Sequence, residues 1–177
     1  MTILLEILFF AFILGSDLIS KELIAPFLKA LPNGESYVVL DKIFSFTYVE
    51  NRGASFGAFN GQQGMLIGIT IIVMIALVGL LIWQKDMPTL PKYAILMIVG
   101  GGIGNLYDRI AFGFVRDFIQ YDFLDTILET LFGTSFAIGN VADIYLCVGV
   151  LMVIVYIIFA FDEKDYSLKW RKKGQNE

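Results

Sequence analysis

The chain has 177 residues, of which 57% are hydrophobic and 17% charged, and its mean hydropathy is +0.73. This composition is too apolar for an ordinary soluble protein, and the length fits one membrane-embedded domain, residues 1–177. The sequence has no histidine and one cysteine, Cys147, which excludes Ser-His-Asp and Cys-His catalysis, histidine-rich zinc motifs and an intrachain disulfide. The formal charge of −4 does not support nucleic-acid binding.

Four segments are long and apolar enough to cross a hydrocarbon core about 30 Å thick. They cover residues 3–24, 64–84, 92–113 and 137–161. They predict an integral, mainly α-helical membrane protein with both termini on one side. Because the first segment lacks the basic region of a cleavable signal peptide, we expect it to be retained as a helix. We interpret Cys147, midway along the fourth segment, as a small packing residue.

The stretch between the first two spans, residues 36–60, has strand character. Tyr37–Leu40 and Ile43–Val49 are rich in β-branched and aromatic residues, and Asp41-Lys42 separates them. Proline and Asn-Gly turn signals precede this stretch at residues 26 and 32–34. The pattern predicts a small extracytoplasmic β-sheet.

Residues 118–132, between the third and fourth spans, carry Asp122, Asp125 and Glu129 at helical spacing among apolar residues. This pattern favours a short amphipathic helix on the membrane surface, with a solvated loop as the alternative. Within the third span, Gly100 and Gly104 form a G-x-x-x-G pair that predicts close helix packing.

The C-terminal tail, residues 162–177, is densely basic. It contains Lys164, Lys169, Arg171, Lys172 and Lys173. The positive-inside tendency therefore places both termini in the cytoplasm, although Lys29, Lys42 and Arg52 on the other side weaken the overall bias.

Four aspartates lie inside or at the edge of the apolar stretches: Asp17, Asp108, Asp117 and Asp143. Intramembrane carboxylates are costly and mark functional sites. Because successive spans alternate in direction, Asp17, Asn105-x-x-Asp108 and Asn140-x-x-Asp143 all lie towards one membrane face, the outer one. Asp143 is expected about 9 Å below the start of its helix. Asp117 can fold back onto them from the loop.

Two carboxylates held close together share a proton, and aspartic proteases use such a pair to activate water and polarise the scissile carbonyl. Structural roles remain alternatives. Asp108 can form a helix-end ion pair with the adjacent Arg109, and Asp17 can pair with Lys21 at i,i+4 spacing. For Asp117 we hypothesise that the neighbouring Arg116 favours the ionised form.

Five blocks resemble, in order, the bacterial lipoprotein signal peptidases, or signal peptidase II. The blocks are Asp17-Leu18-Ile19-Ser20-Lys21, Asn51-Arg52-Gly53-Ala54-Ser55-Phe56-Gly57, Gly101-Gly102-Ile103-Gly104-Asn105-Leu106-Tyr107-Asp108-Arg109, Val115-Arg116-Asp117-Phe118-Ile119 and Asn140-Val141-Ala142-Asp143. The resemblance covers nearly the whole chain apart from the basic tail. Gly139 stands where the family usually has phenylalanine, and Ser55 where it usually has alanine.

This resemblance implies a monomeric intramembrane aspartic endopeptidase of the bacterial inner membrane. Such an enzyme cleaves a prolipoprotein on the N-terminal side of a diacylglyceryl-modified cysteine, contacts membrane phospholipid, needs no metal or organic cofactor and is inhibited by globomycin-like cyclic peptides. The sheet corresponds to a cradle and the surface helix to a lid. The implied catalytic dyad is Asp117 and Asp143; the pocket residues are Asn51, Asn105, Arg109 and Asn140; and the supporting residues are Asp17, Lys21, Gly53, Gly104 and Asp108.

Other functions fit parts of the pattern. A small transporter or proton relay also uses intramembrane aspartates, but the polar groups gather at one face and outline no path across the membrane. A Ser/Lys peptidase would use Ser16 or Ser20 with Lys21, yet adjacent residues of a helix point about 100° apart. A purely structural scaffold leaves the two Asn-x-x-Asp pairs unexplained.

Overall fold

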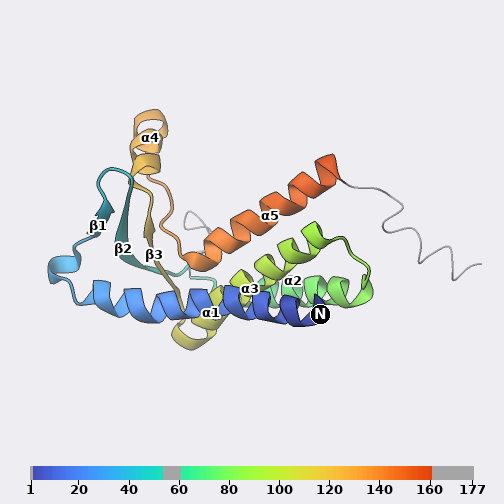
Figure 1. Ribbon diagram of the computed structural model, residues 1–177. Coiled ribbons are helices and arrows are strands. Elements are labelled where there is room, and N and C mark those ends of the chain that lie inside the picture. Colours follow the sequence, from blue (N-terminus) through green and yellow to red (C-terminus); the bar gives the residue numbers. More distant parts are fainter. Residues whose placement is uncertain (1, 54–60, 161–177) are drawn as a thin grey trace, which may run out of the picture.

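A computed structural model describes residues 2–53 and 61–160. Ser55 and the basic tail therefore lie outside the described residues. Four helices are long and apolar enough to cross a membrane: α1 (Thr2–Lys29), α2 (Gln63–Trp83), α3 (Thr89–Phe112) and α5 (Val141–Phe159). The other elements are η1 (Pro32–Gly34), β1 (Tyr37–Leu40), β2 (Phe44–Asn51), β3 (Val115–Gln120) and α4 (Asp122–Phe132). The sheet and α4 gather at one end of the long helices, and the start of α1 and the end of α5 lie at the other (Figure 1).

The first helix continues five residues beyond its predicted end at residue 24 and includes Pro26. Proline removes one backbone donor and usually ends or kinks a helix. Here the turn around it is held by packing, because Ala25 and Leu28 are both only 2% exposed. Tertiary burial thus outweighs the local turn signal.

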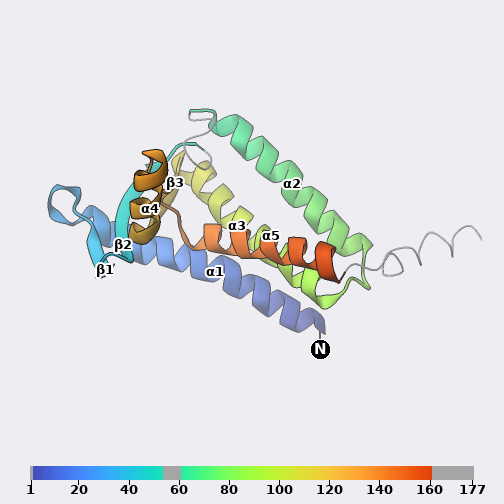
Figure 2. The same ribbon diagram turned by 90° about the horizontal axis from the view of Figure 1, so that it is seen from above.

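Helix α3 is the centre of the bundle and packs against α1, α2 and α5, whereas α2 and α5 stand apart (Figure 2). Its glycines allow this close packing. A Cβ added to Gly100 would lie 2.6 Å from Ile13 Cγ2 on α1, and one added to Gly101 would lie 2.6 Å from the Ala142 carbonyl oxygen on α5. On Gly104 it would overlap the carboxylate of Asp17. The predicted packing role of Gly100 and Gly104 is confirmed.

Gly104→Ala should therefore destabilise the fold. Asp17 is fully buried and its carboxylate is bound on both sides by Lys21 and by the Ala142 N–H, so it has no room to move. Such overpacking costs about 1–3 kcal/mol and should lower the melting temperature in detergent. The matched control is Gly68→Ala on α2, where a Cβ meets nothing within 4 Å. Equal melting temperatures for the two variants would contradict the role of Gly104.

The sheet is antiparallel with strand order β1-β2-β3. Strands β1 and β2 confirm the predicted sheet, but β3 was not predicted. Its residues are nearly all buried, with Phe118 0% exposed and Ile119 9%, packed with Leu28 of α1. A strand buried on both faces lacks the alternation of polar and apolar residues by which strands are recognised.

The segment predicted as one amphipathic helix, residues 118–132, is therefore divided. Its first three residues belong to β3, and α4 begins at Asp122. Helix α4 is amphipathic as expected, with exposed apolar side chains at Phe123, Ile127 and Leu131. The solvated-loop alternative is wrong.

Candidate active site

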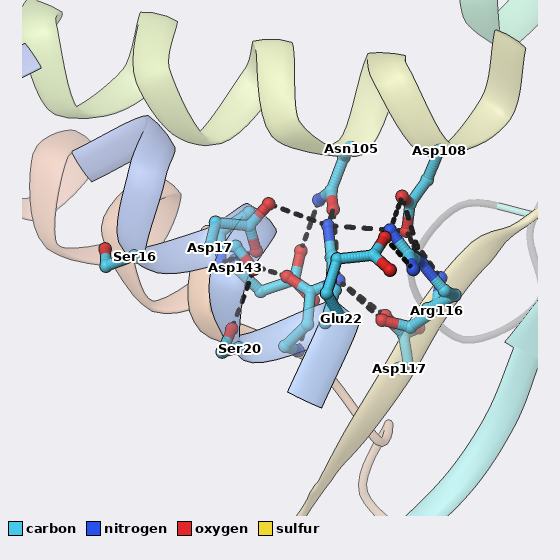
Figure 3. Close-up of polar contacts among 12 residues, drawn as sticks. Ser16, Asp17, Ser20, Glu22, Asn105, Asp108, Arg116, Asp117 and Asp143 are labelled. Atoms are coloured by element: carbon cyan, nitrogen blue, oxygen red, sulfur yellow. Dashed lines mark hydrogen bonds and ion pairs between the residues drawn. The ribbon is translucent and has the colours of Figure 1, made fainter. Parts of the chain in front are cut away.

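The polar residues singled out in the sequence converge where α1, α3, β3 and the start of α5 meet (Figure 3). Asp17 comes from α1, Asn105 and Asp108 from α3, Asp117 from β3 and Asp143 from α5. The side chains of Asp17 and Asp108 are fully buried, and Asp117 is 1% exposed. The convergence that alternating span directions predicted is therefore present.

Asp143 is held at the first turn of α5 by a capping box. The Asn140 Oδ1 accepts a hydrogen bond from the Asp143 N–H at 3.1 Å, and Asp143 Oδ2 accepts one from the Asn140 N–H at 3.0 Å. Since α5 begins at Val141 rather than at residue 137, the predicted depth of Asp143 is wrong, and it lies only about 3 Å along its helix.

The chain just before α5 pairs with β3 and brings Asn140 beside Asp117. The N–H groups of Phe118 and Ile119 donate to the Gly139 carbonyl at 2.8 and 2.7 Å, and the Gly139 N–H donates to the Ile119 carbonyl at 3.0 Å. A Cβ on Gly139 would stand 2.9 Å from Asp143 Oδ2. Because glycine stands at position 139 where the family usually has phenylalanine, space remains beside the Asp143 carboxylate.

Three asparagines supply hydrogen bonds to the two carboxylates. Asn140 Nδ2 donates to Asp117 Oδ1 at 2.6 Å, Asn51 Nδ2 donates to Asp117 Oδ2 at 2.8 Å, and Asn105 Nδ2 donates to Asp143 Oδ1 at 2.9 Å. Together with the Asn140 N–H, which donates to Asp143 Oδ2, these amides provide a hydrogen bond to each of the four carboxylate oxygens.

The orientation of each amide is fixed by what binds its oxygen. Asn51 Oδ1 accepts from the Gly53 N–H at 2.9 Å, and Asn140 Oδ1 accepts from the Asp143 N–H. Asn105 Oδ1 accepts from both Lys21 Nζ at 2.9 Å and Asn140 Nδ2 at 3.0 Å. Because these oxygens face donors, the NH₂ groups must face the carboxylates.

The pKa of Asp117 is raised to about 7, chiefly by burial and next by the negative charge of Asp143, against the lowering effect of its amide hydrogen bonds. The hypothesis that Arg116 favours ionised Asp117 is therefore wrong. Consecutive side chains of a strand point to opposite faces, and the Arg116 guanidinium binds Asp108 at 2.8 Å and Glu22 at 2.7 Å.

Asp108 does not use its sequence neighbour either. The predicted Asp108–Arg109 ion pair is wrong, since Asp108 binds Arg116 through the guanidinium and through the Arg116 N–H at 2.9 Å. Arg109 instead lines the cavity described below and donates from Nη2 to the Gly53 carbonyl at 3.1 Å.

Lys21 supports the site through its contacts with two buried carboxylates. It forms the predicted ion pair with Asp17 at 2.9 Å and lies 3.6 Å from Asp108. Asp17 also accepts a hydrogen bond from the Ala142 N–H at 2.9 Å, so α1 is tied to the first turn of α5.

A cavity of about 690 Å³ opens beside the two carboxylates. Its polar end contains Asn51, Asn105, Arg109, Asp117, Asn140 and Asp143. Its apolar wall is formed by α2, α3 and α5 through Ile69, Val73, Met74, Ile98, Leu146 and Val148. Cys147 also lines it and is exposed, so the interpretation of Cys147 as a packing residue is wrong. In the described part of the chain, no group of three or more His, Cys, Asp or Glu side chains gathers as a metal site.

Comparison with known proteins identifies the family. Residues 9–159 match the family described as signal peptidase (SPase) II. A lipoprotein signal peptidase of Clostridium tetani is 38% identical over 131 residues, which cover 74% of this chain and 80% of that protein. One from Caldanaerobacter subterraneus subsp. tengcongensis is 37% identical over 155 residues, covering 88% and 97%.

A solved structure described as a bacterial membrane enzyme determined by the in meso method has a TM-score of 0.71 with this chain, at 32% identity over 88% of this chain and 94% of that one. The fold and the sequence relationship agree. The chain therefore belongs to the lipoprotein signal peptidase, or signal peptidase II, family, and is a multi-pass bacterial membrane protein and aspartic peptidase that removes signal peptides from prolipoproteins.

Proposed function

We propose that Asp117 and Asp143 form the dyad that activates water for cleavage of the signal peptide. The observation that carries this proposal is their shared support by Asn140, which donates from its side chain to Asp117 and from its backbone to Asp143. Each carboxylate keeps a neighbour of like charge in a buried setting, which favours retention of one proton by the pair.

In this proposal Asp117 carries the proton and Asp143 is the base. The pKa of Asp117, raised to about 7, keeps a large share of this carboxyl protonated at neutral pH. Asp143 lies in the first turn of α5, where the positive end of the helix dipole stabilises an anion. Asp143 removes a proton from water, the hydroxide attacks the scissile carbonyl, and protonated Asp117 donates a hydrogen bond to the carbonyl oxygen. The tetrahedral intermediate then collapses, the C–N bond breaks, and the leaving amine takes the proton that Asp143 holds.

The asparagines and Arg109 have positioning and binding roles in this scheme. Asn51, Asn105 and Asn140 hold the carboxylates, and we assign Arg109 to the substrate peptide because it lines the polar end of the cavity. The Arg109 Nε is buried and has no hydrogen-bond partner among residues 2–53 and 61–160, so it remains free to bind a peptide carbonyl. This arrangement is supported by five residues that do not line the cavity: Asp17, Lys21, Gly53, Gly104 and Asp108.

The substrate class that best fits the cavity is a prolipoprotein whose cysteine carries a diacylglyceryl group. The peptide occupies the polar end and the acyl chains lie along the apolar wall. Side chains of both α2 and α5 line the cavity, so it lies between these two membrane-spanning helices, which supports lateral access from the bilayer. Tyr121 and Leu124 line the cavity beside the site, which supports a covering role for the start of α4.

The orientation proposed for the chain places both termini in the cytoplasm and the dyad near the outer face of the inner membrane. The basic tail supports this orientation. The polar cluster includes Asp117 on β3 and Asp143 at the start of α5, so it gathers at the sheet end of the helices, which argues for a peptidase rather than for a proton path across the membrane.

A cleavage assay tests the substrate. The purified full chain in detergent is given one prolipoprotein in two forms, with a diacylglyceryl-modified cysteine and with an unmodified cysteine. We expect cleavage immediately before the modified cysteine, identified from the intact masses of both products. The unmodified form should be cleaved at least about 100-fold more slowly, because it buries no acyl chains. Equal rates, or cleavage at another bond, would refute the assignment.

A further inference from the structure

Beyond the first turn of the described helices, Thr70 differs from the other serine and threonine residues. The hydroxyls of Ser16, Ser20, Thr126 and Thr130 each donate to the carbonyl oxygen three or four residues earlier in their helix. The Thr70 hydroxyl has no hydrogen-bond partner among residues 2–53 and 61–160. It is thus available to a group outside the chain.

The position of Thr70 indicates which group that is. It lines the cavity from α2, between Ile69 and the pair Val73 and Met74. Helix α2 starts at Gln63, at the sheet end, so Thr70 lies in the first turn of α2 that meets the cavity. The wall is polar around the dyad and apolar beyond Thr70.

A hydroxyl in an apolar wall is unfavourable unless something pairs with it. Burying a hydroxyl or a carbonyl oxygen without a hydrogen bond costs free energy. A hydrogen bond between the two groups removes this cost for both. Acyl chains alone need only hydrocarbon contact, which a valine would provide. The hydroxyl therefore fits a ligand that carries an acceptor between its peptide and its acyl chains.

We propose that Thr70 is a specificity-determining residue that donates a hydrogen bond to an ester carbonyl oxygen of the diacylglyceryl group on the substrate cysteine. This proposal rests on the proposed function, which supplies the lipid-modified substrate. The glyceryl linker is the one polar segment between the cysteine sulfur and the acyl chains. When the cysteine lies at the dyad and the acyl chains lie along α2 and α5, the ester groups of the glyceryl linker lie where the cavity wall changes from polar to apolar.

The test compares Thr70→Val with the parent chain on two precursors. One carries the diacylglyceryl group, and the other carries a dialkylglyceryl ether that lacks both carbonyl oxygens. Thr70→Val should reduce kcat/KM for the ester precursor about three- to tenfold, the range expected for one hydrogen bond, mainly by raising KM. It should change the ether precursor less than about twofold, and Thr70→Ser should retain the parent preference for the ester.

Ile71→Val is the matched control, because Ile71 is the next residue of α2, is 38% exposed and does not line the cavity. It should leave both rates unchanged. An equal loss on ester and ether precursors, or no loss on either, overturns the role of Thr70 while the lipid requirement stands. If the parent chain cleaves lipidated and unmodified precursors equally, the proposed function itself fails.

Discussion

Replacing Asp117 with asparagine should lower kcat for prolipoprotein cleavage by about 10²–10⁴-fold, and Asp143→Asn should lower it to a similar extent. Asparagine keeps the size of the side chain but can neither remove a proton from water nor release one to the peptide. Both oxygens of the buried Asp117 accept from asparagine NH₂ groups, so the new side chain keeps one of these hydrogen bonds and loses the other, and thermal unfolding in detergent checks that the variant folds. Initial rates with the lipidated precursor measure the effect.

The matched control is Asp41→Asn, at an exposed position in the turn between β1 and β2. Its kcat should stay within about twofold of the parent value, as for a surface carboxylate outside the site. The parent should lose activity as the pH rises through about 7, because Asp117 loses the proton it donates. Parent-like rates in either dyad variant, with melting temperatures unchanged, would remove that aspartate from the mechanism.

The sequence predicts the four spans and the clustering of the polar residues well, because both depend on strong signals. Long apolar runs have few competing explanations, and Asp143 has no basic residue within one helical turn to account for it. The direction of each span then determines which polar residues share one end of the bundle. This argument needs no knowledge of packing.

Pairings within the site are less predictable from the sequence. Adjacency suggested Asp108 with Arg109 and Asp117 with Arg116, yet Asp108 binds Arg116. Neighbours in a helix or strand point in different directions, so a long-range partner on β3 replaces the local one. The missing information was the strand itself, since a fully buried strand before an amphipathic helix gives no alternating pattern.

The two Asn-x-x-Asp pairs illustrate the same limit. Asn140 and Asp143 form the capping box that starts α5, whereas Asn105 lies inside α3 and binds Asp143 rather than Asp108. The same i,i+3 spacing thus occurs in two different structures, a capping box at the start of a helix and the interior of a helix. The position of the helix boundary determines which of them forms. The boundary depends on the pairing of Gly139 with Ile119, which is a tertiary contact.

The second large effect is expected on stability. Lys21→Met should destabilise the fold by about 3–5 kcal/mol, the usual cost of removing one partner from a buried ion pair. Lys21 is 0% exposed and pairs with Asp17 while donating to Asn105. The control is Lys29→Met, whose side chain is 50% exposed and 3.5 Å from Glu50, and which should cost less than about 1 kcal/mol. Thermal unfolding in one detergent compares the two.

Double variants identify which carboxylate is left uncompensated. Asp108 keeps Arg116 when Lys21 is removed, but within the described residues Asp17 forms its ion pair with Lys21 alone. Adding Asp17→Asn to Lys21→Met should therefore recover much of the lost stability, whereas adding Asp108→Asn should lose more, because it leaves the buried Arg116 guanidinium with only the exposed Glu22 as its ion-pair partner within the described residues. Equal recovery from both would show that Lys21 neutralises the two carboxylates jointly. Because Lys21 also fixes the Asn105 amide that holds Asp143, the stabilised double variant should remain impaired in cleavage, which separates support of the fold from support of the dyad.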